Sequence, residues 1–323
     1  MERFRLNRHP PSGSNRQGLI ARWHAPIRTD AVSPIAASRH ARLALIALLA
    51  GGVAIGGSPI FVRLSEVGPM ATAFWRVSLA LLPFFLMSRM ARQGDETPAG
   101  LRDHLLLLLP GVFLALDLAA WHLSLHMTSV ANATLLANLA PVFVTLGSWL
   151  VFRTRITPIF LSGLALALAG VIVLKGGPAA ISGGQLAGDA TAIVAAFFYA
   201  CYMLSLGHVR ARFSTLRIMV WTTLSAAVCM LPAAFFLEGS MLPATLFGWS
   251  MLFGLAFISH VGGQGLVTYA LAYLPTAFSS LTLLLQPVVA AILAWVLLAE
   301  PVGMTQAVGG AIVLLGILVA RRG

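Results

Sequence analysis

The feature that most constrains this chain is a series of ten apolar runs, each about long enough to cross a lipid bilayer as a helix. A spanning helix needs about 20 predominantly apolar residues. Helices are expected because every backbone polar group must be satisfied internally in lipid, and the runs lack the alternation of barrel strands. The sequence therefore predicts an all-α integral membrane protein. The runs are 42–62, 70–90, 104–125, 130–152, 157–175, 188–208, 217–237, 247–270, 276–299 and 303–320.

Charged residues are too scarce for a soluble protein. They make up 10% of the 323 residues, whereas roughly a quarter of the residues in a soluble domain are charged. The net charge of +11 could indicate nucleic acid, but the basic residues precede the first apolar run or lie almost entirely between the runs. That distribution is typical of a membrane protein oriented by its basic loops. We therefore expect a lipid bilayer as partner and no nucleic acid.

The basic residues also predict the orientation. With the amino terminus in the cytoplasm, 18 of the 21 Lys and Arg residues fall on the cytoplasmic side. Only Arg63 and Lys175 fall outside, and Arg76 lies within a helix. Ten crossings return the carboxyl terminus to the cytoplasm, where Arg321 and Arg322 lie. The prediction is a multi-pass protein of the inner cell membrane with both termini cytoplasmic.

The chain repeats itself at an offset of 146 residues. Each repeat holds five apolar runs, and because five is odd, the second repeat enters the membrane from the opposite face. The sequence thus predicts about ten transmembrane helices in two inverted five-helix repeats, a recurrent plan of secondary transporters. The pairs in this register include Trp75 with Trp221, Pro141 with Pro287, Trp149 with Trp295, Gly163 with Gly309 and Gly170 with Gly316.

These boundaries divide the chain into five parts. We expect a basic, disordered cytoplasmic arm, two repeats joined by an outer linker, and a short cytoplasmic tail. The parts are 1–41 for the arm, 42–175 for the first repeat, 176–187 for the linker, 188–320 for the second repeat and 321–323 for the tail.

Several short motifs carry a resemblance to a known family. They are Phe74–Arg76, Thr128–Leu136, Pro141–Phe143, Pro275–Leu283, Gln286–Val288 and Glu300–Pro301, with the glycines Gly163, Gly170, Gly309 and Gly316. In these residues the chain resembles the drug/metabolite transporter superfamily, specifically its EamA-type members with ten helices in two repeats. The resemblance implies export of amino acids, other metabolites or drugs. One departure is that Thr154 stands where the second repeat has Glu300, so an acid often found at the end of helix 4 is missing.

Two charged residues lie within the predicted helices, where polar groups are expensive and so mark candidate sites. Arg76 is about 10 Å, and Asp117 about 12 Å, from the outer ends of their helices. Two interpretations stay open. The residues form an ion pair that locks two helices, or Asp117 binds a substrate amine or a coupling proton while Arg76 steadies it or meets a carboxylate.

The other site candidates are polar and aromatic residues. His260 and Gln264 share one helical face with Thr268, and His260 either responds to pH or hydrogen-bonds a neighbouring helix. The remaining side chains are expected to line a cavity or to make contacts between helices. The substrate-binding candidates are Asp117, Trp121, Asn138, Tyr199, His260, Gln264 and Gln286, and the candidates for an ion pair or proton coupling are Arg76, Asp117 and His260.

Two prolines lie within the predicted helices, and three glutamates lie between them. Pro141 and Pro287 each remove a backbone donor near mid-membrane, so we expect kinks there and consider both prolines candidate hinges. Glu66, Glu238 and Glu300 fall in outer loops and are expected to be solvated.

The motifs of an enzyme are missing from the sequence. It has no His-Glu-x-x-His, no paired intramembrane aspartates and no phosphate-binding loop, so we expect no catalytic residue, no metal and no cofactor. The predicted function is secondary transport of small amphipathic metabolites such as amino acids, by alternating access between the repeats, and the direction of export is what the family resemblance implies. A multidrug or other hydrophobic-solute exporter is the alternative, and a channel or lipid scramblase is the rival from another class. A coupled proton and the choice between monomer and homodimer stay open.

Overall fold

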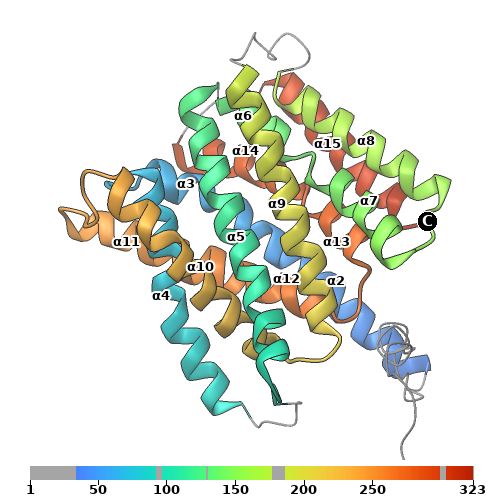
Figure 1. Ribbon diagram of the computed structural model, residues 1–323. Coiled ribbons are helices and arrows are strands. Elements are labelled where there is room, and N and C mark those ends of the chain that lie inside the picture. Colours follow the sequence, from blue (N-terminus) through green and yellow to red (C-terminus); the bar gives the residue numbers. More distant parts are fainter. Residues whose placement is uncertain (1–33, 92–96, 129, 177–185, 299–302, 323) are drawn as a thin grey trace, which may run out of the picture. The chain divides into compact units, whose positions relative to one another are not determined.

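The protein is described here by a computed structural model, covering residues 34–91, 97–128, 130–176, 186–298 and 303–322. The chain divides into two units, Met1–Ala37 and Ser38–Gly323, and the fold below is that of the second. Its described residues form helices and connecting loops without any strand (Figure 1). The predicted all-α class is therefore confirmed. Most of the predicted arm, residues 1–33, lies outside the described residues.

The described helices combine into ten apolar spans. Eight are long and apolar enough to cross a membrane, and two shorter apolar helices, α8 and α15, complete the ten. Several spans consist of consecutive helical pieces. The elements of the first half are α2 (Pro34–Gly56), α3 (Ser58–Arg63), α4 (Pro69–Met90), α5 (Leu101–Met127), α6 (Val130–Ala137), α7 (Ala140–Phe152) and α8 (Pro158–Leu174). Those of the second half are α9 (Leu186–Arg210), α10 (Thr215–Leu237), α11 (Leu246–Gly254), the π-helix η2 (Leu255–Gln264), α12 (Gly265–Ala270), α13 (Thr276–Thr282), α14 (Leu285–Leu298) and α15 (Met304–Ala320).

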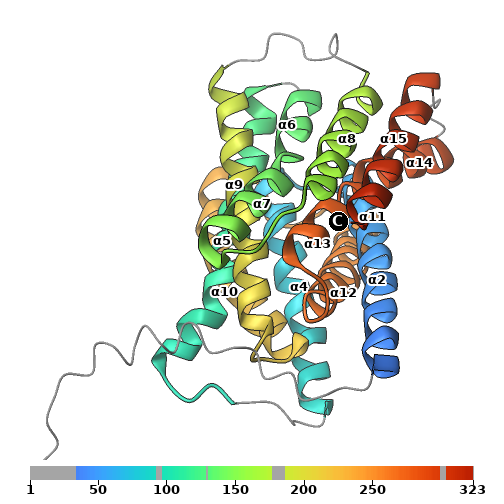
Figure 2. The ribbon, with the colours of Figure 1, turned by 90° about the vertical axis from the view of Figure 1, so that its right-hand side faces the viewer.

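Helices α8 and α15 pack antiparallel along their length, and both views show them side by side (Figures 1 and 2). A Cβ atom added at Gly309 would collide with the backbone of Leu174, so only glycine allows this approach. Four contacts of this kind join the two helices. When both residues of one contact are shifted by the repeat offset of 146, the result is another of the four, which is what two inverted repeats require. The predicted architecture of inverted repeats is confirmed. The four contacts are Gly163 with Ala320, Gly309 with Leu174, Gly170 with Val313 and Gly316 with Ala167.

Two spans are interrupted at equivalent places, each just before a proline. The break between α6 and α7 contains Asn138, and the break between α13 and α14 contains Leu284. Pro141 and Pro287 cannot donate to the carbonyl four residues earlier, so the helix cannot continue regularly there. The chain instead makes tighter bonds from residue i to residue i−3, such as the Asn138 backbone N–H to Leu135 O at 3.1 Å.

At one end of the bundle, two glutamates hold the amino termini of helices. We call this end, with loops 64–68 and 238–245, the Glu66 end. The backbone N–H groups of Ala244 and Thr245 donate to Glu66 Oε2 at 3.0 and 2.9 Å, and the Thr245 hydroxyl donates to Oε1. Glu238 Oε1 accepts from the Met70 backbone N–H at 2.6 Å. Glu66 is exposed and Glu238 partly exposed, as expected for solvated residues, and both in addition accept hydrogen bonds from the unsatisfied donors of helix termini.

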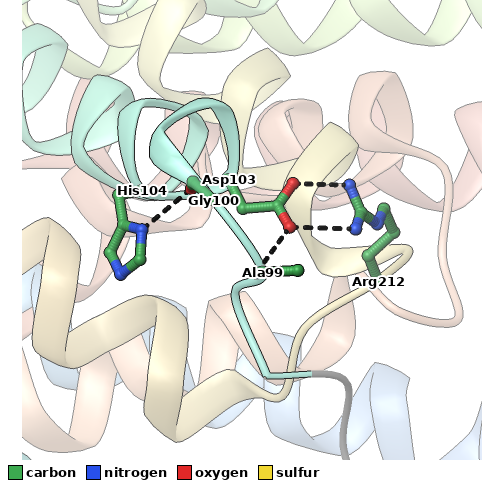
Figure 3. Close-up of polar contacts among 5 residues, drawn as sticks. All are labelled: Ala99, Gly100, Asp103, His104 and Arg212. Atoms are coloured by element: carbon green, nitrogen blue, oxygen red, sulfur yellow. Dashed lines mark hydrogen bonds and ion pairs between the residues drawn. The ribbon is translucent and has the colours of Figure 1, made fainter.

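The opposite end of the bundle carries an ion pair. We call this end, with loops 97–100, 153–157, 211–214 and 271–275, the Asp103 end. Arg212 Nη1 donates to Asp103 Oδ1 at 3.0 Å and Nη2 to Oδ2 at 3.3 Å, while the Ala99 backbone N–H donates to Oδ2 (Figure 3). Residues 66 and 212 differ by the repeat offset of 146. Each end therefore has a loop tied to the start of a helix in the other repeat.

Substitution of Gly309 by valine should destabilise the protein. The added side chain would meet the Leu174 backbone, which cannot move aside as a flexible side chain would, and overpacking of this kind costs about 1–3 kcal/mol. We expect a lower thermal unfolding midpoint for the purified variant. Gly239→Val is the matched control, because a Cβ atom at Gly239 has no neighbour within 4 Å. Equal midpoints for the two variants would contradict the close contact.

Substitution of Glu66 by glutamine should cost stability in a pH-dependent way. The hydrogen bond from the Thr245 side chain, with backbone N–H donors, holds the pKa of Glu66 below its ordinary value of 4.5. A lowered native pKa means that the ionised carboxylate stabilises the fold above pH 4.5, and that this contribution is lost as pH falls through the native pKa. Unfolding midpoints of the parent and Glu66→Gln should thus differ at neutral pH and converge in acid. A difference that is constant with pH would argue against the ionised contact.

Candidate functional site

A cavity of about 920 Å³ lies between the two repeats. Helices α2 to α8 contribute lining residues from the first repeat, and α9, η2, α13, α14 and α15 contribute them from the second. The lining runs from the middle of the helices to the Glu66 end, and of the described residues none from the loops at the Asp103 end takes part. Small-molecule sites measure about 300–1,000 Å³, so the cavity can hold a metabolite with some water.

The structure brings most of the candidate residues to this cavity. Six of the seven substrate-binding candidates line it, together with Arg76 and both prolines. The six candidates come from five different elements or breaks, so only the assembled bundle brings them together. Asp117 and Trp121 are on α5, Asn138 is in the α6–α7 break, Tyr199 is on α9, Gln264 ends η2 and Gln286 is on α14. Their roles in binding stay predictions.

Arg76 and Asp117 face the cavity without forming a direct ion pair. Their charges act on each other electrostatically, but among the described residues no ion pair within 4.0 Å joins them. The Nε atom of Arg76 is buried and has no hydrogen-bond partner in this part of the chain. A buried guanidinium nitrogen left without an acceptor is costly. The locking ion pair is therefore not formed in this state, and both charges are available to a solute.

Gln264 is oriented by a buried tyrosine. The Tyr202 hydroxyl donates to Gln264 Oε1 at 3.1 Å, and Tyr202 is fully buried. Tyr199 packs on Tyr202, with their ring centroids 5.8 Å apart. Tyr199 also lines the cavity, where it interacts electrostatically with Asp117. Gln264 and Tyr199 thus form one wall whose orientation is fixed by contacts outside the cavity.

His260 does not line the cavity. Its Nε2 atom lies 3.2 Å from the Thr223 hydroxyl of α10, and its ring meets Phe84 edge-on. Thr268 also faces α10, where its hydroxyl donates to the Met219 thioether sulfur Sδ at 3.2 Å. Residues 260, 264 and 268 are all buried, but only Gln264 of the three lines the cavity. Thr268 contacts α10 through Met219, and His260 does so through Thr223. Of its two interpretations, the structure shows the hydrogen bond to a neighbouring helix.

Sequence reasoning missed several residues of the lining, and Lys175 and Arg63 are the most informative. Lys175 follows α8 and is partly buried. It is the only lysine of the chain. The signal was present, because Arg63 and Lys175 are the two basic residues that the charge bias leaves on the sparsely charged side. A lysine at a helix end is ordinarily assigned to the membrane interface, so Lys175 was not predicted to line a cavity.

Comparisons with known proteins bear on the whole chain. The sequence pattern of one family, described as "EamA-like transporter family", matches residues 42–175 and 186–322. Two uncharacterized transporters from Archaeoglobus fulgidus are each 28% identical over 279 and 269 residues, which cover 85% and 81% of this chain and 95% and 91% of those proteins. A probable terminal-alkyne amino-acid exporter from Streptantibioticus cattleyicolor is 29% identical over 202 residues, covering 59% of this chain and 64% of that protein.

A solved structure shares the fold. It is described only as "Crystal structure of protein", and it superposes with a TM-score of 0.71 at 18% identity. The superposition covers 88% of this chain and 98% of that one. At this identity the likeness concerns the fold alone.

Proposed function

The chain belongs to the EamA-like transporter family, and on that basis we propose that it is a secondary carrier that exports small amphipathic metabolites such as amino acids. The observation that carries the proposal is the cavity of about 920 Å³, which both inverted repeats line and which reaches only one end of the bundle. A permanent channel would need a path through both ends. A cavity closed at one end is what a carrier has in one of its two states.

Alternating access follows from the symmetry of the repeats. The offset of 146 residues relates the tie at Glu66 to the tie at Arg212, so the packing at either end has a counterpart at the other. In the proposed cycle the ion pair between Arg212 and Asp103 opens while the Glu66 end closes. The breaks before Pro141 and Pro287 lie against the cavity and are the proposed hinges, because a helix interrupted there can change direction without breaking further bonds.

The side of the membrane to which the cavity opens depends on how the protein is oriented in the bilayer. We place the protein in the inner cell membrane with both termini in the cytoplasm, as the bias of basic residues supports. The Glu66 end then faces outside, and the structure corresponds to the state that releases an exported solute. Loading would take place in the state that is open at the Asp103 end.

The lining supplies complementary groups for an amino acid. Asp117 is the proposed partner of the ammonium group and Arg76 of the carboxylate, since charge-assisted hydrogen bonds are the strongest available there. Asn138, Gln264 and Gln286 would supply further polar contacts. The name of the Streptantibioticus cattleyicolor relative, a probable terminal-alkyne amino-acid exporter, supports amino acids as the first class to test.

Substitution of Asp117 by asparagine should impair transport while leaving expression and folding intact. Loss of the charge removes the proposed partner of the ammonium group, and a hydrogen bond to a charged group contributes about 1.5–3 kcal/mol, or at least tenfold in affinity. The measurement is counterflow in proteoliposomes loaded with each of a panel of amino acids. Asp189→Asn is the matched control, because Asp189 bonds Thr128 and does not line the cavity.

The same vesicles separate the rival functions. Saturable exchange establishes a carrier, whereas unsaturated flux indicates a channel and lipid movement indicates a scramblase. A response to a pH gradient that disappears in Asp117→Asn would assign a coupled proton to Asp117. Unchanged kinetics of Asp117→Asn at every pH would remove this residue from the site.

A further inference from the structure

The cavity lining has an excess of positive charge. Arg63, Arg76 and Lys175 line it, and Asp117 is the one acidic residue among the described lining residues. The other described acids near the Glu66 end are held elsewhere. Glu66 bonds Thr245, Glu238 bonds the Met70 backbone, and Asp189 accepts from the Thr128 hydroxyl.

This excess is notable because basic residues are scarce at the Glu66 end. Arg63 and Lys175 are the two that the sequence provides there, and both line the cavity. Both lie at carboxyl ends of helices, where a positive charge is favoured by the helix dipole. The dipole explains why a cation is tolerated at each position. It does not explain why each lines the cavity rather than extending toward lipid headgroups, as long basic side chains at membrane interfaces do.

The position of Lys175 is fixed by the contact of α8 with α15. The preceding residue, Leu174, lies against the backbone of Gly309, and the Lys175 backbone N–H continues the helix by donating to Val171 O at 3.1 Å. Gly176 then turns the chain with a φ of 110°. The Lys175 ammonium has no hydrogen-bond or ion-pair partner within the described part of the chain. A partly buried cation at a fixed place, without an anion, is an available site for one.

The repeat supplies an internal comparison. The residue equivalent to Lys175 at the offset of 146 is Arg321, which follows α15 as Lys175 follows α8. Arg321 is at the Asp103 end and does not line the cavity. Lys175 and Arg321 thus have equivalent positions in the fold and the same charge, but only Lys175 lies beside the cavity.

We propose that the cavity selects solutes with a net negative charge, in particular amino acids with an acidic side chain, and that Lys175 is a specificity-determining residue that receives the second acidic group. The proposal rests on the carrier function above. The ammonium group lies with Asp117, one carboxylate with Arg76 and the other with Lys175. A neutral amide in place of the second carboxylate forms weaker bonds to the ammonium group of Lys175, and a cationic side chain is repelled.

The test is calorimetric titration of the purified full-length protein with L-glutamate, L-glutamine and L-arginine. These probes share the amino acid backbone groups and differ in side-chain charge. We expect glutamate to bind about tenfold more tightly than glutamine, with arginine weakest, since one hydrogen bond between charged groups is worth about that much. Lys175→Gln should lower the affinity for glutamate about tenfold and leave that for glutamine nearly unchanged, and Lys175→Arg should keep the preference. Arg321→Gln, at the equivalent position without a cavity, should behave like the parent.

Several outcomes would overturn the inference. Equal binding of glutamate and glutamine by the parent would do so, as would no binding of either, or equal losses in Lys175→Gln and Arg321→Gln. The parent's preference can be measured even if a variant does not fold. The carrier function is judged separately by exchange in proteoliposomes. Binding of glutamate without exchange would refute the carrier alone, whereas saturable exchange of neutral amino acids without preference for glutamate would refute the charge selection alone.

Discussion

The contact of α8 with α15 is the constraint on which the arrangement of the two repeats depends. Backbones meet at four glycines, so neither helix can slide along the other without a collision between backbone atoms. The two contacts at Gly163 and Gly309 exchange under the repeat offset, which makes this surface the place where the pseudo-symmetry is most directly visible. In a carrier that changes between two packings, such a contact can stay fixed while the helices around the cavity move.

The cavity concentrates the polar groups that the rest of the bundle excludes. An unsatisfied polar atom in lipid costs several kcal/mol by typical values, so polar side chains inside a membrane gather where water or a solute can reach them. This explains why a list of intramembrane polar residues chosen from the sequence became, with one exception, a list of cavity residues. Both helix breaks also lie at the cavity, which Asn138 and Leu284 line.

The sequence was sufficient to predict the ten spans, the repeat and most of the candidate residues that line the cavity. The predictions that failed did so for physical reasons. His260 was expected at the cavity because it is polar and close to the middle of its span, but tertiary packing places its ring against Thr223 of α10. The hydrogen bonds of Glu66 could not be predicted because its partners, Ala244 and Thr245, are almost 180 residues away in the chain. Lys175 was missed because the direction of a side chain at a helix end is decided by tertiary packing.

The two ties at the ends of the bundle are equivalent in position but unlike in chemistry. Glu66 accepts hydrogen bonds from neutral groups, whereas Asp103 faces the guanidinium of Arg212, whose side chain is 46% exposed. Dissolved ions screen an exposed ion pair and affect bonds to neutral donors far less. Ionic strength therefore acts mainly on the tie at the Asp103 end. Since this ion pair opens in the proposed cycle, the balance between the two proposed states depends on the salt concentration at the Asp103 face.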